Sequence, residues 1–258
     1  MSSPALTVTA LHRYPVKGLS PEPLTAAALT AGNYFPGDRL FAVENGPSGF
    51  DPAAPVHQPK IKYLMLMRNE ALARLRTSYD DATGVLTIQE GDREAARGDL
   101  ATREGRLAIE AFFRRYLPKE LRGPPKVLEA PEGYRFTDSR SGYVSLINLA
   151  SVAAVEAMVG APVDPLRFRG NLHFTGLPAF AELDLVGSDL VTDGGLRLKV
   201  TKRIVRCAAT NVDPVTGERD LAIPDALQRN LGHADCGIYA EVVAGGEVRP
   251  GDVLRVAG

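Results

Sequence analysis

The sequence is poor in cysteine. Only Cys207 and Cys236 occur among the 258 residues. Two thiols are too few for a disulfide scaffold, and such a low content is typical of a protein kept in a reducing compartment. We therefore expect a cytoplasmic protein whose fold depends on core packing, and 45% hydrophobic residues are enough for one large core or two small ones.

The chain also lacks an excess of either charge and lacks long apolar runs. Its 30 basic and 31 acidic residues give a net charge of −1. No global positive field is available to hold a nucleic-acid backbone, so we expect no nucleic-acid partner, and any anion site must be local. Neither a signal peptide nor a membrane span is expected, because no run of about 18 apolar residues occurs and residues 1–11 lack a basic start.

The first half of the sequence contains the alternation of apolar and polar residues that is typical of β-strands. Leu6, Val8 and Ala10 alternate with Thr7 and Thr9, which is the period of a half-buried strand. Further strands are predicted at residues 40–43, 63–67 and 85–88, separated by turn-forming stretches at 45–55 and 80–84. This arrangement favours an antiparallel β-barrel or sandwich.

Two helices are predicted near the middle of the chain. Apolar residues at helical spacing mark residues 107–117, and Pro118 begins the end of that helix. The second helix spans residues 149–159, with Asn148 as its N-cap and Gly160 as its stop. Between them, residues 123–133 are rich in Pro, Gly and Glu without periodicity, so they form either a linker or a surface loop.

Polar and apolar residues alternate again at residues 166–174. Read as a strand, this segment places Arg167, Arg169, Asn171 and His173 on one face. Arginine forks match phosphate or carboxylate oxygens, and the Asn171 amide adds a neutral hydrogen bond, so this face is suited to an oxyanion-bearing ligand. The alternative is an ordinary solvated strand face.

A second strand, at residues 196–207, carries five basic residues and ends at Cys207. Positive charge favours the thiolate, which is the form that binds metals and attacks electrophiles. The alternative is that Cys207 is a small buried hydrophobic residue at a strand end. Asp213 opens a turn at residues 213–217, where it either caps the turn or accepts a proton.

Several motifs resemble one known family. The run RCAATNVDPVTG at residues 206–217 resembles the MOSC domain, a module of molybdenum cofactor sulfurases and amidoxime-reducing components. YPVKG at 14–18 and GDRLFAV at 37–43 are similar to the β-barrel domain that precedes MOSC in these proteins. FRGN at 168–171, GIYA at 237–240 and VRPGD at 248–252 match later motifs in the family order. The resemblance therefore covers essentially the whole chain.

The resemblance implies a mainly β fold with some α-helix. Residues 1–118 would form an N-terminal MOSC-type β-barrel domain and residues 119–258 a β-barrel MOSC domain. The molybdenum cofactor, Mo-molybdopterin, would lie between them, with Cys207 as the thiolate ligand of the metal.

The resemblance also assigns residues to the phosphate and pterin of the cofactor. Those that fall on family motif positions are Lys17, Arg39, Arg169 and Asn171. Asn148 is placed by aligning residues 146–152 with a Ser-bearing family segment, and Arg167 by strand geometry alone. Asp213 matches the family's acidic position, where it either relays protons as a catalytic residue or caps the turn.

The function implied is an oxidoreductase that reduces N-hydroxylated small molecules at a Cys207-ligated molybdenum. Two cysteines and the lack of a Gly-rich dinucleotide motif leave no internal electron donor, so a separate ferredoxin- or flavin-type reductase is expected. The alternative is a sulfur carrier, or a carrier that transfers the molybdenum cofactor, acting through Cys207. A zinc site on Cys207, His233 and Cys236 is a third interpretation, although closed zinc sites take four ligands.

Overall fold

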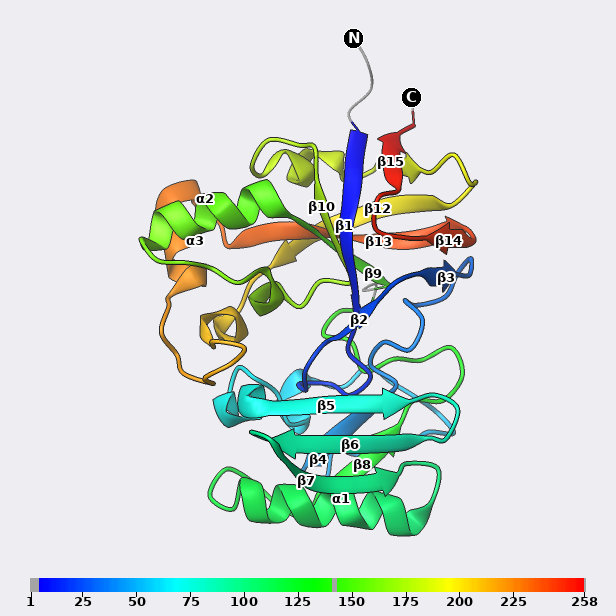
Figure 1. The fold of residues 1–258 in the computed structure, drawn as a ribbon, viewed down its shortest axis with the longest axis vertical. Helices are drawn as coiled ribbons and strands as arrows, with labels where there is room; N and C mark the ends of the chain where they lie inside the picture. The colour runs from blue at the N-terminus through cyan, green and yellow to red at the C-terminus, as the bar shows by residue number, and fades with distance from the viewer. Residues whose placement is uncertain (1–4, 141–142, 258) are drawn as a thin grey trace.

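The computed structural model describes residues 5–140 and 143–257. Within these residues the fold is mainly β with three α-helices and has two stacked parts (Figure 1). The upper part is a β-barrel, and the lower part holds a small three-stranded sheet with a helix beneath it. Within the described residues, no helix combines the length and apolar character needed to cross a bilayer.

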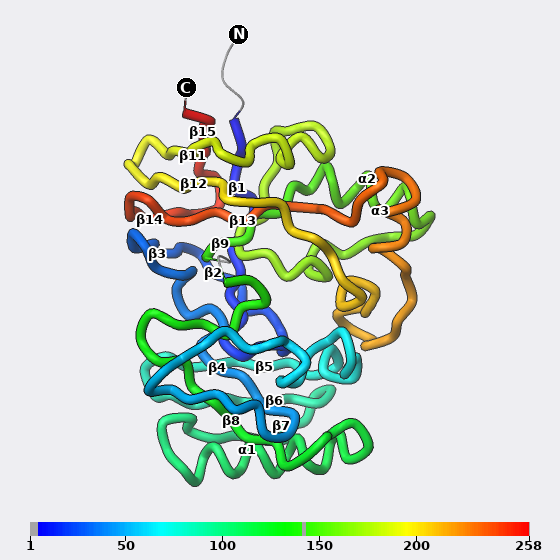
Figure 2. The backbone as a smooth tube through the Cα atoms, turned by 180° about the vertical axis from the view of Figure 1, so that it is seen from behind, coloured from blue at the N-terminus to red at the C-terminus, as the bar shows by residue number. Residues whose placement is uncertain are grey.

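Seven strands close the barrel, and β2 (Glu22–Leu24) extends its sheet beyond β1. Their order around the barrel is β10, β9, β13, β12, β11, β15 and β1, and a further pairing of β10 with β1 closes the ring. In chain order they are β1 (Ala5–Arg13), β9 (Val144–Asn148), β10 (Leu172–Thr175), β11 (Asp189–Val191), β12 (Arg197–Val205), β13 (Asp235–Ala244) and β15 (Val253–Val256). The short strands β3 (Ala27–Leu29) and β14 (Gly246–Val248) pair beside the barrel (Figure 2).

The first strand belongs to the barrel rather than to the lower part. β1 pairs antiparallel with β10 through Thr7↔Thr175 and with β15 through Ala5↔Arg255. Its side chains Leu6, Val8 and Leu11 are buried in the largest core cluster. The predicted alternation holds for Leu6 and Val8, but a register shift between Val8 and Ala10 brings Leu11 into the core in place of Ala10. The N-terminal segment is thus part of the structure built by the second half of the chain.

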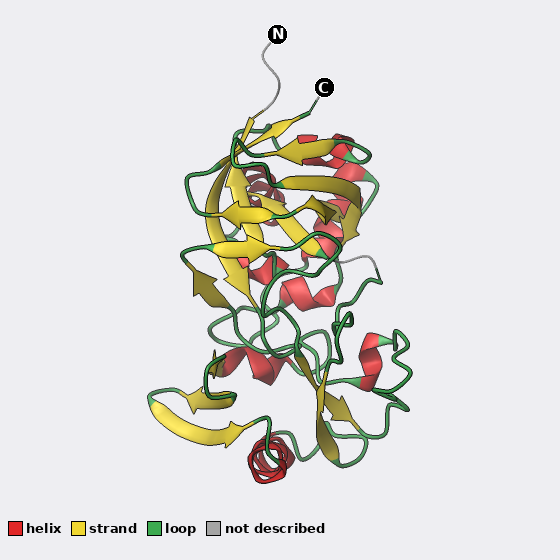
Figure 3. Ribbon diagram, turned by 90° about the vertical axis from the view of Figure 1, so that its right-hand side faces the viewer, coloured by secondary structure: helices red, strands yellow, loops and turns green. Residues whose placement is uncertain are grey.

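The lower part packs one helix against two small sheets. Strands β5 (Leu75–Asp80), β6 (Val85–Glu90) and β7 (Arg93–Asp99) form an antiparallel meander, and β4 (Phe41–Asn45) pairs with β8 (Pro125–Glu129). Helix α1 (Arg103–Tyr116) begins at Thr102, whose side chain accepts from the Gly105 N–H. The helix lies at the base of the molecule, seen end-on in Figure 3.

Two further helices cover one side of the barrel. Helix α2 (Leu149–Val159) is capped by the Asn148 side chain and ends at Gly160, whose φ of 72° suits glycine. These ends confirm the prediction from the sequence. Helix α3 (Ile223–Leu231) packs against α2 around a core cluster that includes Val155 and Leu227.

Three local predictions were wrong. Residues 166–174 are not one strand, because Asp164 caps a 3-10 turn over Pro165–Phe168 and Arg169 is left-handed (φ 52°), so that β10 starts only at Leu172. Residues 63–67 form turns with a single bridge to Glu44 rather than a strand. Residues 123–133 are not a linker, since they contain β8. The division of the chain after residue 118 stays a prediction.

Candidate functional site

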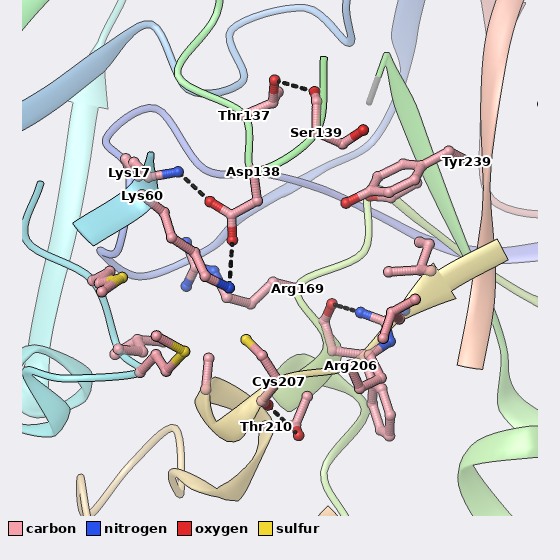
Figure 4. Close-up of a pocket in the computed structure, with 18 of the residues that line it drawn as sticks. Lys17, Lys60, Thr137, Asp138, Ser139, Arg169, Arg206, Cys207, Thr210 and Tyr239 are labelled. Atoms are coloured by element: carbon pink, nitrogen blue, oxygen red, sulfur yellow. Dashed lines mark hydrogen bonds and ion pairs between the residues drawn. The ribbon is translucent and has the colours of Figure 1, made fainter. Parts of the chain in front are cut away.

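A cleft of about 350 Å³ opens where the barrel meets the lower part. Segments from far apart in the sequence line it. From the first half come Lys17, Arg39 and residues 65–67; from the second half come the ends of β12 and η3 (Pro165–Phe168), with Tyr239 of β13. Figure 4 shows the side chains of Lys60, Asp138 and Cys207 facing the same space.

The lining is strongly cationic. Within the described lining, Asp138 is the sole carboxylate. The eight cationic residues are Lys17, Arg39, Lys60, Arg167, Arg169, Lys202, Arg203 and Arg206. The whole chain is nearly neutral, with a net charge of −1. The cleft nevertheless concentrates positive charge and therefore attracts anions locally.

Cys207 lies at the end of β12, where the strand turns into the 3-10 helix η5 (Ala208–Asn211). Its carbonyl oxygen accepts from the Thr210 amide at 3.0 Å and from the Thr210 hydroxyl at 2.9 Å, which fixes the backbone. The partly exposed thiol projects into the cleft (Figure 4). β12 and this turn therefore aim the sulfur at the cationic space.

Lys60, in the 3-10 helix η1 (Lys60–Lys62), reaches the thiol from the opposite wall. Its ammonium is within hydrogen-bonding reach of the Cys207 sulfur, and its Nζ lies 3.7 Å from Asp138 Oδ2. Burial acts to lower the pKa of Lys60, but Asp138 and Cys207 outweigh it, and the pKa is raised. Lys60 therefore stays protonated beside the sulfur at neutral pH.

Lys17 and Asp138 form the second feature of this wall. Lys17 Nζ donates to the Phe136 carbonyl oxygen at 2.9 Å and to Asp138 Oδ1. Burial lowers the pKa of Lys17 even though Asp138 acts in the opposite direction. For Asp138, burial acts to raise the pKa, but the ammonium groups of Lys17 and Lys60 hold it well below its ordinary value. The Asp138 carboxylate is therefore held in its charged form, and its contact with Lys17 Nζ is an ion pair.

Arg169 supplies an unused donor. Its guanidinium lies over the Tyr14 ring, 4.2 Å from the centroid, and Nη1 donates to the Leu19 carbonyl oxygen at 2.8 Å. Its buried Nη2 has no hydrogen-bond partner within the described parts of the chain. Burial lowers the pKa of Arg169 to about 10, so the group is still charged at neutral pH. An anion in the cleft would satisfy this nitrogen.

Arg206 and Cys236 are structural. Arg206 is buried and donates to the carbonyl oxygens of Cys236, at 2.6 Å from Nε, and of Phe168, at 2.8 Å from Nη1. Burial raises the pKa of the Cys236 thiol to about 12, so this cysteine is inert packing in β13. Among residues 5–140 and 143–257, no three His, Cys, Asp or Glu side chains gather as a metal site, and so the zinc interpretation lacks a ligand set.

Two family models match the sequence. The model described as MOSC domain matches residues 133–255, and the MOSC N-terminal beta barrel domain matches residues 5–115. The chain belongs to the MOSC family. It is 33% identical over 111 aligned residues to a curated molybdenum cofactor sulfurase from Caenorhabditis elegans; the match covers 40% of this chain but only 15% of that protein.

Two solved structures match this MOSC protein at lower sequence identity. The YUAD protein from Bacillus subtilis is 12% identical, with 98% of this chain and 95% of that chain covered and a TM-score of 0.46. YiiM from Geobacillus stearothermophilus is 20% identical, with coverage of 46% and 56% and a TM-score of 0.37.

Most of the residues predicted from the sequence meet in the cleft of the MOSC protein. Those that line it are Cys207, Lys17, Arg39, Arg167, Arg169 and Asn171. Arg167 is committed to ion pairs, because its two terminal nitrogens each lie 2.8 Å from Asp220 and Nη2 also lies 3.0 Å from Asp213. Asn171 accepts from Ser145 and donates to the His12 carbonyl oxygen, so it joins β9, β10 and β1.

Two predicted residues lie outside the cleft lining. Asn148 is fully buried, caps α2, and donates to Glu182 Oε2 and the Pro178 carbonyl oxygen at 2.9 Å each. Asp213 accepts from the Val215 and Thr216 amides through one oxygen and from Arg167 through the other. Its pKa is lowered, because these hydrogen bonds outweigh burial. The geometry thus gives Asp213 the turn-capping role and gives Asn148 a helix-capping role.

Two residues of the site were missed from the sequence. Lys60 and Asp138 come from segments without strand or helix periodicity and far from the recognised motifs. The fold brings them to the Cys207 sulfur and to each other. A single sequence holds no local signal for either, because their partners are distant in the chain.

Proposed function

We propose that this MOSC protein binds the molybdenum cofactor, Mo-molybdopterin, in the cleft and reduces N-hydroxylated small molecules there. The observation that carries the proposal is a single accessible thiol, Cys207, aimed into a space lined by cations. Thiolates are preferred ligands of soft metals, and phosphate groups are bound by arginine and lysine. The similarity to a molybdenum cofactor sulfurase supports the same ligand.

The residues present fit this cofactor. Cys207 would hold the metal, while Lys17, Arg39 and Arg169 would hold the phosphate and pterin. The buried Arg169 Nη2, which has no partner within the described residues, supports an anionic or acceptor group on the ligand, since a buried donor without a partner costs about 1–3 kcal/mol. The cleft volume of about 350 Å³ falls in the range of small-molecule sites.

When bound, the cofactor would supply the two-electron chemistry. Reduction of an N-hydroxyl group consumes two electrons and two protons and gives an amine and water. Lys60 is suited to hold one of these protons, because it stays protonated and its ammonium reaches the Cys207 sulfur. Arg169 and Lys202 would orient polar groups of the ligand from the other walls.

The electrons would come from a separate ferredoxin- or flavin-type reductase, since two cysteines cannot hold an iron–sulfur cluster. The same low cysteine content, with both thiols free, supports a cytoplasmic location.

Turnover tests the proposal. Protein produced in a host that makes molybdenum cofactor is mixed with reduced methyl viologen and either hydroxylamine or an amidoxime. We expect turnover by the wild type and by the control Cys236→Ala, whose thiol is buried away from the cleft. Cys207→Ser should lose at least 100-fold in rate.

A molybdenum-containing wild type that reduces neither compound would contradict the reductase. The second candidate, a carrier of sulfur or of the molybdenum cofactor, would then be favoured. One observation supports it, because the Cys207 thiol is partly exposed and therefore open to transfer chemistry.

A further inference from the structure

Asp138 is an unusual member of the cleft, because it places a negative charge where the other charged lining residues are positive. We propose that Asp138 is a built-in counter-ion that occupies the anion subsite of Lys17 and Lys60 in the ligand-free protein and gives way when a phosphate-bearing ligand binds. This proposal rests on the proposed function in one respect, namely that the ligand carries a phosphate.

The need for a counter-ion comes from Lys17. Its side chain is only 6% exposed, and an ammonium removed from water is costly unless an opposite charge or strong acceptors lie beside it. The Phe136 carbonyl oxygen supplies one acceptor and the Asp138 carboxylate supplies the charge. Among the described lining residues, Asp138 is the carboxylate that can balance the Lys17 charge when no anion is bound.

The two partners differ in exposure. The Asp138 side chain is 48% exposed, whereas that of Lys17 is almost fully covered. The carboxylate therefore reaches the buried ammonium from the solvent side and can return to water once another anion takes its place beside Lys17. Asp138 also lies outside every helix and strand, so turning its side chain away breaks no regular structure.

The contact with Lys60 is loose. Lys60 Nζ and Asp138 Oδ2 are 3.7 Å apart, beyond a normal hydrogen bond, so Lys60 retains donors for another partner. Arg169 Nη2 is the second unused donor in the same cleft (Figure 4). A phosphate in the cleft could therefore contact three cationic side chains, those of Lys17, Lys60 and Arg169. Asp138 already contacts the two lysines.

A phosphate and the Asp138 carboxylate would compete for these cations. Like charges that share one site repel, so either the ligand binds less tightly or the carboxylate leaves. Removing only the charge should therefore strengthen anion binding. Lys17 should keep its position in Asp138→Asn, because the Phe136 carbonyl oxygen still holds it and the amide oxygen can still accept.

The test is calorimetric titration of inorganic pyrophosphate into cofactor-free protein, produced in a host that cannot make molybdenum cofactor. We expect Asp138→Asn to bind about tenfold more tightly than the wild type. The matched control is Asp193→Asn, which makes the same charge change at an 86% exposed side chain paired with Arg255, outside the cleft lining. The affinity of this control for pyrophosphate should stay within twofold of that of the wild type.

Weaker or unchanged binding by Asp138→Asn would overturn the proposal and would show that the carboxylate holds the lysines for the ligand. Binding by neither protein would overturn it as well. Asp138→Ser is a second neutral variant should the amide disturb folding, and the same gain is expected. The result is separable from the proposed function, since molybdenum content and turnover are measured on different protein and do not enter this titration.

Discussion

Arg169 has a constrained backbone and an incomplete set of hydrogen bonds. A φ of 52° is rare for a side chain of this size and persists only where the surroundings enforce it. The Tyr14 ring and the Leu19 carbonyl oxygen fix the guanidinium, and Nη2 stays open. Such a combination is expected of a ligand-binding residue rather than of one that only stabilises the fold.

This makes a residue-level prediction. Arg169→Gln should lower the molybdenum content of purified protein to less than half, because a charge-assisted hydrogen bond contributes about 1.5–3 kcal/mol. Arg255→Gln is the matched control, since Arg255 lies outside the cleft lining and pairs with an 86% exposed Asp193. Equal molybdenum contents in the two variants, measured by plasma mass spectrometry, would contradict the role given to Arg169.

His173 gives a prediction for the pH dependence of stability. Its ring centroid lies 4.8 Å from that of His12, and burial, followed by the charges of His12 and Arg206, lowers its pKa from 6.5 to about 4. The unfolded state therefore binds a proton more readily, so stability is full above pH 6.5 and is lost as the pH falls toward 4. Between pH 7 and pH 5 the unfolding free energy should fall by about 2 kcal/mol from this group.

Urea unfolding at several pH values measures this effect. His173→Asn cannot take up the proton, so its stability should fall less steeply over the same interval. His12 has a pKa lowered mainly by burial, so it acts in the same direction and should leave a residual slope. Parallel pH profiles for His173→Asn and the wild type would show that the loss comes from other groups.

At the level of elements, the turn after β12 depends on the 3-10 helix η3. Arg167 of η3 is almost fully covered and joins Asp213 and Asp220, on the segment that follows Cys207. Breaking a buried ion pair by removing one partner typically costs 3–5 kcal/mol. Because both carboxylates are partly exposed here, we expect Arg167→Met to lower the unfolding free energy by about 2–3 kcal/mol.

The control for this prediction is Arg203→Met, which breaks an exposed pair and should cost less than about 1 kcal/mol. Thermal and urea unfolding of both variants make the comparison. If the two losses were equal, Arg167 would not be the residue that holds the segment after Cys207 in place.

The elements also show what the sequence could predict. Helix α2 was predicted to the residue, because the Asn148 cap and the Gly160 stop are local signals. The alternation at residues 166–174 predicted one continuous strand, and this prediction was wrong. The segment consists of a 3-10 turn, one left-handed residue and a short strand, which together show the same alternation of polar and apolar residues. Cys207 and Arg169 were found through motifs, whereas Lys60 and Asp138 depend on contacts that only the fold creates.

At the level of the whole molecule, the barrel depends on both ends of the chain. β1 lies between β15 and β10 and closes the ring. A fragment of residues 119–258 would expose the edges of β10 and β15 and the core side chains that Leu6 and Val8 cover. We expect this fragment alone to show no cooperative unfolding transition in circular dichroism.

Adding back the missing strand is the matched test. A chain in which residues 1–30 are joined to residues 119–258 by a flexible linker should regain a cooperative transition. Native-like cooperative unfolding of residues 119–258 by themselves would show that the barrel does not need β1.

We propose that Cys207 is the protein ligand of molybdenum in the cation-lined cleft. The most direct measurement is metal analysis by plasma mass spectrometry of wild type and Cys207→Ala, both produced in a host that makes molybdenum cofactor. We expect close to one molybdenum per chain in the wild type and a loss of most of it in the variant. No molybdenum in either protein, or undiminished molybdenum in Cys207→Ala, would contradict it.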